Sequence, residues 1–344
     1  MTEYIIEKLK DLTAIPSPTG YTHLAAEYVM QELNSLGFSP RLTNKGCVVC
    51  DLGGEGNPII LSAHIDTLGG MVEEIKANGR LKITRLGGLR AENIEGENCE
   101  IRTRDGKTYS GCFMLNDPSV HVNKDYGETK RDFDNMEVVI DENVKTAEDT
   151  EKLGLANGDF VCFDPRTTVT ESGYIKSRFL DDKLSVAILL GLAKEVKEGT
   201  VNFRRKTYLF ITVYEEVGHG ACAGYPSDAT EIMSVDMGCV GQGLKCTERD
   251  VSICIKDSAG PYNYEVTTKL INLAKERGLS YAADVYPYYG SDADAALSAG
   301  ADMKHSLIGA GVYASHGYER SHIEGVKNTL SLIKAYVTSS SAKA

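Results

Sequence analysis

The sequence lacks any apolar run that approaches the length of a membrane span, and its first residues, Met-Thr-Glu-Tyr-Ile-Ile-Glu-Lys, lack the pattern of a signal peptide. We therefore expect a cytoplasmic protein that makes no membrane contact. Basic residues are also few, because 37 lysines and arginines stand against 49 aspartates and glutamates and leave a net charge of −12. Such a charge argues against a nucleic-acid-binding surface and against binding to anionic membranes.

Regular cysteine spacing is missing as well. The nine cysteines are odd in number and irregularly spaced, which suits reduced thiols better than a disulfide framework. Cys47 and Cys50 form a C-x-x-C pair, but no second pair with zinc-site spacing follows. We interpret this pair as structural.

The pattern up to residue 66 is typical of an α/β layer. Apolar residues at helical spacing predict helices over residues 3–14 and 21–36. Strand-like runs follow over residues 41–52 and 59–63, and the second of them ends on His64-Ile65-Asp66. No internal repeat, low-complexity segment or long linker interrupts the 344 residues, which suffice for two domains.

A different pattern occupies residues 71–163. Short alternating runs are separated by turn signals such as Asn78-Gly79 and Asp105-Gly106, and no long helical period appears. Two polar segments, 116–134 and 141–151, have the composition of loops. The expected fold is therefore an α/β domain in two pieces, with a small all-β, barrel-like domain inserted into it. The expected bounds are 1–67 and 164–344 for the α/β domain and 68–163 for the insertion.

After the insertion, a strand-like run over residues 206–214 leads directly into Glu215-Glu216 and a glycine-rich turn. Open α/β sheets place their active sites at the carboxyl edge of the strands. Two neighbouring carboxylates can divide the work there, one binding a metal while the other acts as a general base. On this stretch alone, an exposed acidic turn is the alternative interpretation.

Metal-type ligands follow several of the predicted strands and turns. They are His64-x-Asp66, Asp181-Asp182, Glu215-Glu216 and Asp236, with His316 and His322 near the C-terminus. The set mixes imidazole with carboxylate and contains no thiolate, which favours zinc, cobalt or manganese in a hydrolytic site. Alternate residues of a strand share a face, so Asp66 could orient the His64 ring.

Four motifs carry a family resemblance. Ala-His-Ile-Asp, Phe-Leu-Asp-Asp-Lys, Tyr-Glu-Glu-Val-Gly and Val-Asp-Met-Gly, in this order, resemble the glutamyl/deblocking aminopeptidases, the self-compartmentalising "TET" metallopeptidases. The resemblance covers almost the whole chain, including the insertion. Two departures concern the site. The turn after Glu216 is one residue shorter than in the family and contains only His219 before Gly-Ala, and the C-terminal histidine motif differs.

The resemblance implies a metal-dependent aminopeptidase that removes the N-terminal residue of short peptides through a bridging water. Glu215 would be the base that activates this water, and Asp182 would support the ligands from behind. Two divalent ions per subunit, zinc or else cobalt or manganese, would be bound by His64, Asp181, Glu216, Asp236 and His316. Among these, His64 and Asp236 would bind one ion, Glu216 and the histidine the other, and Asp181 would bridge them.

The choice of the C-terminal histidine rests on counting back from the last helix, which favours His316. His322 would then lie in the pocket or behind the ligands, and His219 could touch the substrate. The resemblance also implies that the inserted domain dimerises subunits and that dimers assemble into a dodecamer. The alternatives are a related dinuclear amidohydrolase, such as a deacylase or carboxypeptidase, a non-catalytic scaffold, or a family member labelled as a glucanase. We discount glucanase activity because glycoside hydrolysis uses two free carboxylates without a metal.

Overall fold

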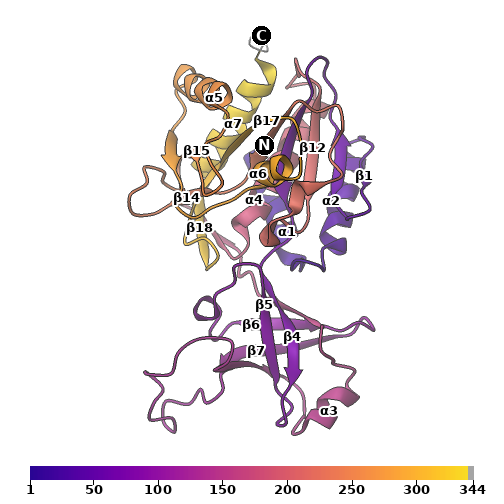
Figure 1. The fold of residues 1–344 in the computed structure, drawn as a ribbon, viewed down its shortest axis with the longest axis vertical. Coiled ribbons are helices and arrows are strands. Elements are labelled where there is room, and N and C mark those ends of the chain that lie inside the picture. The colour runs from indigo at the N-terminus through magenta and orange to yellow at the C-terminus, as the bar shows by residue number, and fades with distance from the viewer. Residues whose placement is uncertain (340–344) are drawn as a thin grey trace.

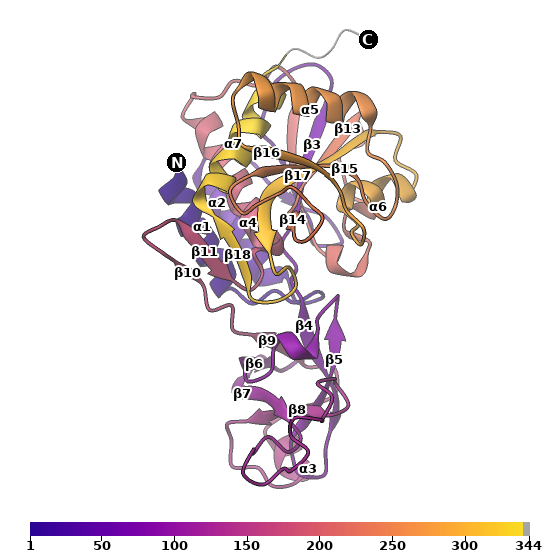
Figure 2. The same cartoon turned by 90° about the vertical axis from the view of Figure 1, so that its left-hand side faces the viewer.

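The computed structural model describes residues 1–339 and contains a large α/β unit from which a smaller β-barrel projects (Figures 1 and 2). The predicted fold class, a mixed-sheet α/β unit with an inserted barrel, is confirmed. Within the described residues, no helix combines the length and the apolar character needed to cross a bilayer.

The α/β unit is built around a 12-stranded mixed sheet. Its central strands run parallel and are buried on both faces, in the order β12 (Thr207–Thr212), β3 (Ile59–His64), β13 (Glu231–Val235) and β17 (Lys304–Tyr313). Parallel strands need such cover because both of their faces are apolar. The carboxyl ends of these strands therefore meet at one edge of the sheet.

Eight further strands complete the sheet on the two sides of this central group. On one side lie β1 (Arg41–Leu42) and β2 (Val48–Asp51); on the other lie β10 (Thr168–Val169), β11 (Tyr174–Ser177), β14 (Gly238–Val240), β15 (Val251–Lys256), β16 (Tyr281–Val285) and β18 (Glu319–His322). The sequence did not predict β10, β11, β14 or β18. Each spans only two to four residues, too few for an alternating pattern to show.

Helices cover the two faces of the sheet unequally. One face packs against α1 (Thr2–Ala14), α2 (His23–Ser35), α4 (Leu180–Lys197), α5 (Tyr264–Glu276) and α7 (Ile323–Thr338). The other face carries α6 (Asp292–Ser298). Helix α4 lies at the centre of the first layer, because its residues 184–193 are all buried. This helix begins with a kink at Asp181 and Asp182, whose backbone is not helical.

The barrel closes in the order β4-β5-β8-β7-β6-β9 around a core of its own. Its strands are β4 (Gly69–Ile75), β5 (Leu81–Leu86), β6 (Asn98–Arg102), β7 (Thr108–Leu115), β8 (Met136–Ile140) and β9 (Phe160–Phe163). A short helix, α3 (Ala147–Lys152), lies in the segment 141–151 that the sequence predicted as a loop. A capping box between Thr146 and Asp149 stabilises it. The domain bounds at residues 67 and 163 and a role in assembly stay predictions.

A buried ion-pair group joins the barrel to the α/β unit. Glu97 of the barrel accepts hydrogen bonds from Arg178 Nη2 at 2.7 Å and Nε at 3.2 Å. Arg166 Nε lies 2.9 Å from the same carboxylate. Glu97 and Arg178 are each about 5% exposed, so the pair fixes the barrel close to the kinked start of α4.

Candidate active site

The parallel strands bring the predicted site residues to one edge. His64 is the last residue of β3 and is paired with Thr212, the last residue of β12. Glu215 and Glu216 follow β12 in a single 3-10 turn, and Asp236 follows β13. These three segments are neighbours in the sheet, which is why residues far apart in the sequence converge here.

The carboxylate of Asp181 lies between two imidazoles. Its Oδ1 is 3.0 Å from His64 Nε2, and its Oδ2 is 3.4 Å from His316 Nε2. Glu216 Oε2 lies 3.6 Å from His316 Nε2, whereas Glu215 Oε2 lies 3.7 Å from His64 Nε2. The adjacent glutamates therefore face different histidines.

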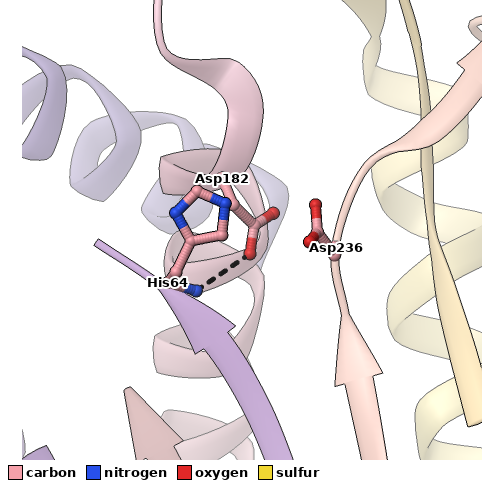
Figure 3. A group of neighbouring side chains, drawn as sticks. All are labelled: His64, Asp182 and Asp236. Carbon is pink, nitrogen blue, oxygen red and sulfur yellow. Dashed lines mark hydrogen bonds between the residues drawn. The ribbon is translucent and has the colours of Figure 1, made fainter. Parts of the chain in front are cut away.

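A second group contains His64, Asp182 and Asp236 (Figure 3). The backbone N–H of His64 donates to Asp182 Oδ2 at 3.1 Å, and the carboxylates of Asp182 and Asp236 face each other (Figure 3). Asp182 follows Asp181 in the chain and is fully buried.

Two acids hold the backbone of the site. Asp66 accepts hydrogen bonds from the backbone N–H groups of Glu215 and Glu216 at 3.1 and 3.4 Å and from the Thr19 hydroxyl at 2.7 Å. The His64 ring is oriented by the backbone carbonyl of Asp66, which accepts from Nδ1 at 2.9 Å, while the Asp66 carboxylate is 3.6 Å from that nitrogen.

Glu319 is the second acid that holds the backbone of the site, at Asp181 and His316. Its carboxylate accepts from the backbone N–H groups of Asp181 at 3.1 Å and His316 at 2.9 Å. Sequence reasoning did not assign Glu319 to the site. The available signal was its place three residues after a candidate ligand histidine.

Backbone strain gathers at the same place. Tyr214, which precedes the two glutamates, has φ of 68°, and Phe179, before the kink of α4, has φ of 67°. His316 itself has φ of 61°. Non-glycine residues in this region each cost on the order of 1–3 kcal/mol and cluster at functional sites. Glycine is required next to His316, because a Cβ at Gly88 would lie 2.6 Å from the ring.

The acids at this edge repel one another. Burial, followed by the charge of Asp181, raises the pKa of Asp236 to about 7. Burial and the charge of Asp236 raise the pKa of Glu215 well above its usual range. Burial also opposes ionisation of Asp181, but the two histidines outweigh it and lower its pKa. The protein alone does not supply enough positive charge for this set of carboxylates.

The donor set fits divalent metal ions. Ligand atoms of His64, Asp181 and Glu216 lie within 4.8 Å of one another, as do those of His64, Asp182 and Asp236. Within residues 1–339, Asp182 Oδ1 and Glu216 Oε1 are buried without a hydrogen-bond partner. Buried polar atoms are normally satisfied, so these two oxygens in a cluster of imidazole and carboxylate fit the binding of a cation.

A cavity of about 680 Å³ opens in front of these residues. Glu215, Glu216, Asp181, Asp236 and His316 line one side of it, and α6 and the segment before it line another. The barrel contributes Gly88, Arg90 and Asn93. The cavity is large enough for an amino-acid residue and part of the chain that follows it.

Two predicted residues lie apart from this cavity. Both ring nitrogens of His322 are engaged at the start of α7, with Ser172 O at 2.9 Å and with the backbone N–H of Glu324 at 3.0 Å. His219 is exposed and its ring stacks on Tyr214 at 5.1 Å. Neither residue lines the cavity.

Comparison with known proteins agrees with this architecture. The family model described as M42 glutamyl aminopeptidase matches residues 46–332. The putative aminopeptidase YhfE of Bacillus subtilis (strain 168) is 45% identical over 336 residues, which are 97% of this chain and 97% of that protein. The TET1 peptidase of Pyrococcus horikoshii, which can assemble into a tetrahedron or a large octahedral shell, has a TM-score of 0.84 at 24% identity over 97% of this chain and 99% of its own. The aminopeptidase APDkam598 of Desulfurococcus kamchatkensis has a TM-score of 0.86 at 22% identity, covering 98% of this chain and 96% of its own.

Proposed function

The chain belongs to the M42 glutamyl aminopeptidase family and is an aminopeptidase, and on this premise we propose that it removes the N-terminal residue of short peptides with two divalent metal ions and Glu215 as the general base. The observation that carries the proposal is the divergence of the adjacent glutamates. Glu216 Oε2 lies 3.6 Å from His316 Nε2, and Glu216 forms a candidate ligand group with His64 and Asp181; Glu215 Oε2 instead lies 3.7 Å from His64 Nε2 and belongs to neither candidate ligand group.

The metal ligands we propose are grouped around Asp181, whose carboxylate lies between the imidazoles of His64 and His316. His64 and Asp236 would hold one ion and His316 and Glu216 the other, and Asp181 would serve both. Zinc suits this donor set, and cobalt or manganese are alternatives. When bound, the ions would polarise the peptide carbonyl and lower the pKa of a water molecule.

The remaining chemistry belongs to side chains of this protein. The Glu215 carboxylate would accept a proton from the attacking water and return it to the amine that leaves when the C–N bond breaks. Asp66 keeps Glu215 in place through the backbone N–H, at 3.1 Å. The Asp66 carbonyl fixes the tautomer of His64, which leaves Nε2 facing Asp181.

The test is hydrolysis of aminoacyl p-nitroanilides by protein that has been stripped with a chelator and then reloaded with zinc, cobalt or manganese. Activity should vanish on stripping, return with metal, and be absent on N-acetylated versions of the same substrates. Equal rates on acetylated and free substrates would instead indicate an amidohydrolase that does not require a free N-terminus, and release of acetate without p-nitroaniline would indicate a deacylase. Activity that survives complete metal removal would contradict the proposed centre.

We also propose that the barrel segment 68–163 mediates self-association into dimers that assemble into a dodecamer; the P. horikoshii TET1 peptidase can itself assemble into a tetrahedron or a large octahedral shell. In this chain, Val120 and Val122 support the proposal, because they are 59% and 78% exposed in the barrel's long loop. Sedimentation at micromolar concentration should show a large particle, and Val120→Asp with Val122→Asp should give smaller ones. A wild-type monomer under these conditions would exclude the proposal.

A further inference from the structure

The cavity has a second acidic feature away from the proposed metal ligands. Helix α6 lines one wall with Asp292, Asp294, Ala295 and Ser298. Asp292 is committed to the fold, because it accepts hydrogen bonds from the backbone N–H of Ala221 and from the Thr212 hydroxyl. A Cβ at Gly220 would collide with it. Asp294 is therefore the carboxylate of this wall that can serve a ligand.

Asp294 is held firmly but is only partly satisfied. Its Oδ2 accepts hydrogen bonds from the Tyr262 hydroxyl at 3.0 Å and the Ser291 hydroxyl at 3.2 Å. Tyr262 also donates to Asp257 Oδ2 at 2.7 Å. Asp294 Oδ1 is 3.9 Å from His305 Nε2, which is too far for a hydrogen bond. The side chain of Asp294 is 14% exposed and lines the cavity, so its carboxyl group is recessed but accessible.

Among residues 1–339, no lysine or arginine forms an ion pair with Asp294, and of the basic side chains only the imidazole of His305 lies near it. Burial lowers the pKa of His305, so this imidazole is neutral near pH 7. Burial and the neighbouring Asp257 raise the pKa of Asp294 to about 7. A positively charged ligand would lower the pKa of Asp294 again, because an opposite charge nearby favours the ionised carboxylate.

Arg90 is the competing charged residue of the cavity, and it belongs to the barrel wall. Its side chain is 64% exposed and lies 3.3 Å from the exposed Glu92. An exposed, already paired arginine is a weak selector compared with a recessed carboxylate. An acidic substrate side chain is therefore the less favoured occupant.

We infer that Asp294 is a specificity-determining residue that selects peptides whose N-terminal residue has a cationic side chain, lysine or arginine. The inference rests on the proposed function, because it assigns the cavity to the N-terminal residue. The lysine ammonium or arginine guanidinium would contact Asp294 Oδ1, while Tyr262 and Ser291 hold the other oxygen in place.

The experiment compares kcat/KM for the p-nitroanilides of lysine, arginine, leucine and glutamate. Wild-type protein should prefer lysine and arginine. Asp294→Asn should reduce kcat/KM on these two by roughly 10- to 100-fold, as expected for loss of a hydrogen bond between charged groups. The value for leucine should stay within about twofold. Asp302→Asn, an exposed acid beyond the same helix, is the matched control and should change none of the ratios.

A second variant protects the test against misfolding of Asp294→Asn. Ser298 is exposed one turn further along α6 and also lines the cavity. Ser298→Lys should lower the lysine-to-leucine ratio several-fold by like-charge repulsion. A wild-type preference for glutamate would overturn the inference. So would an unchanged lysine-to-leucine ratio in Asp294→Asn. If Asp294→Asn does not fold, an unchanged ratio in Ser298→Lys would overturn it instead. Absence of activity on all four substrates would instead contradict the proposed function.

Discussion

Buried carboxylates are treated in opposite ways in the two parts of the molecule. In the barrel, Glu137 is 1% exposed and is neutralised locally by Lys76 at 2.6 Å and Arg80 at 2.5 Å. At the edge of the large sheet, four acids and Glu215 converge on only two imidazoles, and two carboxylate oxygens have no partner. The chain itself supplies the cations that neutralise Glu137, whereas at the sheet edge five acids face two imidazoles.

The difference separates a structural role from a functional one. Burying an unpaired charge costs far more than burying a hydrogen-bonded pair, so a fold selected for stability alone would not collect acids in this way. The strained backbone of residues on both sides of the cluster supports the same conclusion. The stability of the barrel should therefore depend on its ion pairs, and that of the sheet edge on bound metal.

The largest expected effect comes from Glu215→Gln. Glutamine keeps the shape of the side chain but cannot accept the proton, so kcat should fall by about 10²- to 10⁴-fold. Both metals should remain bound, as measured by elemental analysis, because Glu215 is not one of the ligands we propose. Glu216→Gln is the adjacent control and should lose metal as well as activity. If Glu215→Gln loses a metal, the roles of the two glutamates are exchanged.

The next effect distinguishes the two C-terminal histidines. His316→Ala should lose one of two metals and nearly all activity, because its Nε2 faces both Asp181 and Glu216. His322→Ala should keep both metals. It should lower the free energy of unfolding by about 1 kcal/mol, because its Nδ1 caps α7 at the backbone N–H of Glu324. The reverse pattern of metal contents would move the site by six residues.

A smaller effect is expected in the barrel. Glu137→Gln should lower the free energy of unfolding by about 1–3 kcal/mol, because two cations lose their buried partner. Glu73→Gln is the control, since Glu73 is 49% exposed on the same barrel and its pair with Lys82 spans 3.5 Å. That variant should change stability by less than about 0.5 kcal/mol. Both variants should keep kcat on aminoacyl anilides, as followed beside urea unfolding. If Glu137→Gln and Glu73→Gln are equally stable, the buried ion pairs of Glu137 do not stabilise the barrel, and the contrast with the sheet edge is lost.

The sequence predicted the parts of this architecture that have a local pattern. The strand before Glu215 and the strand 231–235 could be identified because buried parallel strands are continuous apolar runs. The candidate ligands were found from their position after such runs. Glu319 and Asp294 were not assigned roles, because what matters for them is which backbone N–H or cavity they face. The short strands β11 and β18 form through antiparallel pairing between distant segments, which no local period reveals.

The contrast also yields the smallest prediction, a pH dependence of substrate choice. Glu137 faces two cations, but Asp294 faces the carboxylate of Asp257, the Tyr262 phenol and the imidazole of His305. Burial and Asp257 raise the pKa of Asp294 to about 7, so its charge is lost as the pH falls through that value. Since kcat/KM reports the free enzyme, the lysine-to-leucine ratio should rise by up to about tenfold between pH 6 and 8. The side-chain ammonium of the lysine substrate stays charged between pH 6 and 8. Titration of the catalytic groups of the enzyme affects both substrates equally and cancels in the ratio. In Asp294→Asn the ratio should be flat, and a wild-type ratio that is flat or falls with pH would show that Asp294 does not meet the substrate as a carboxylate.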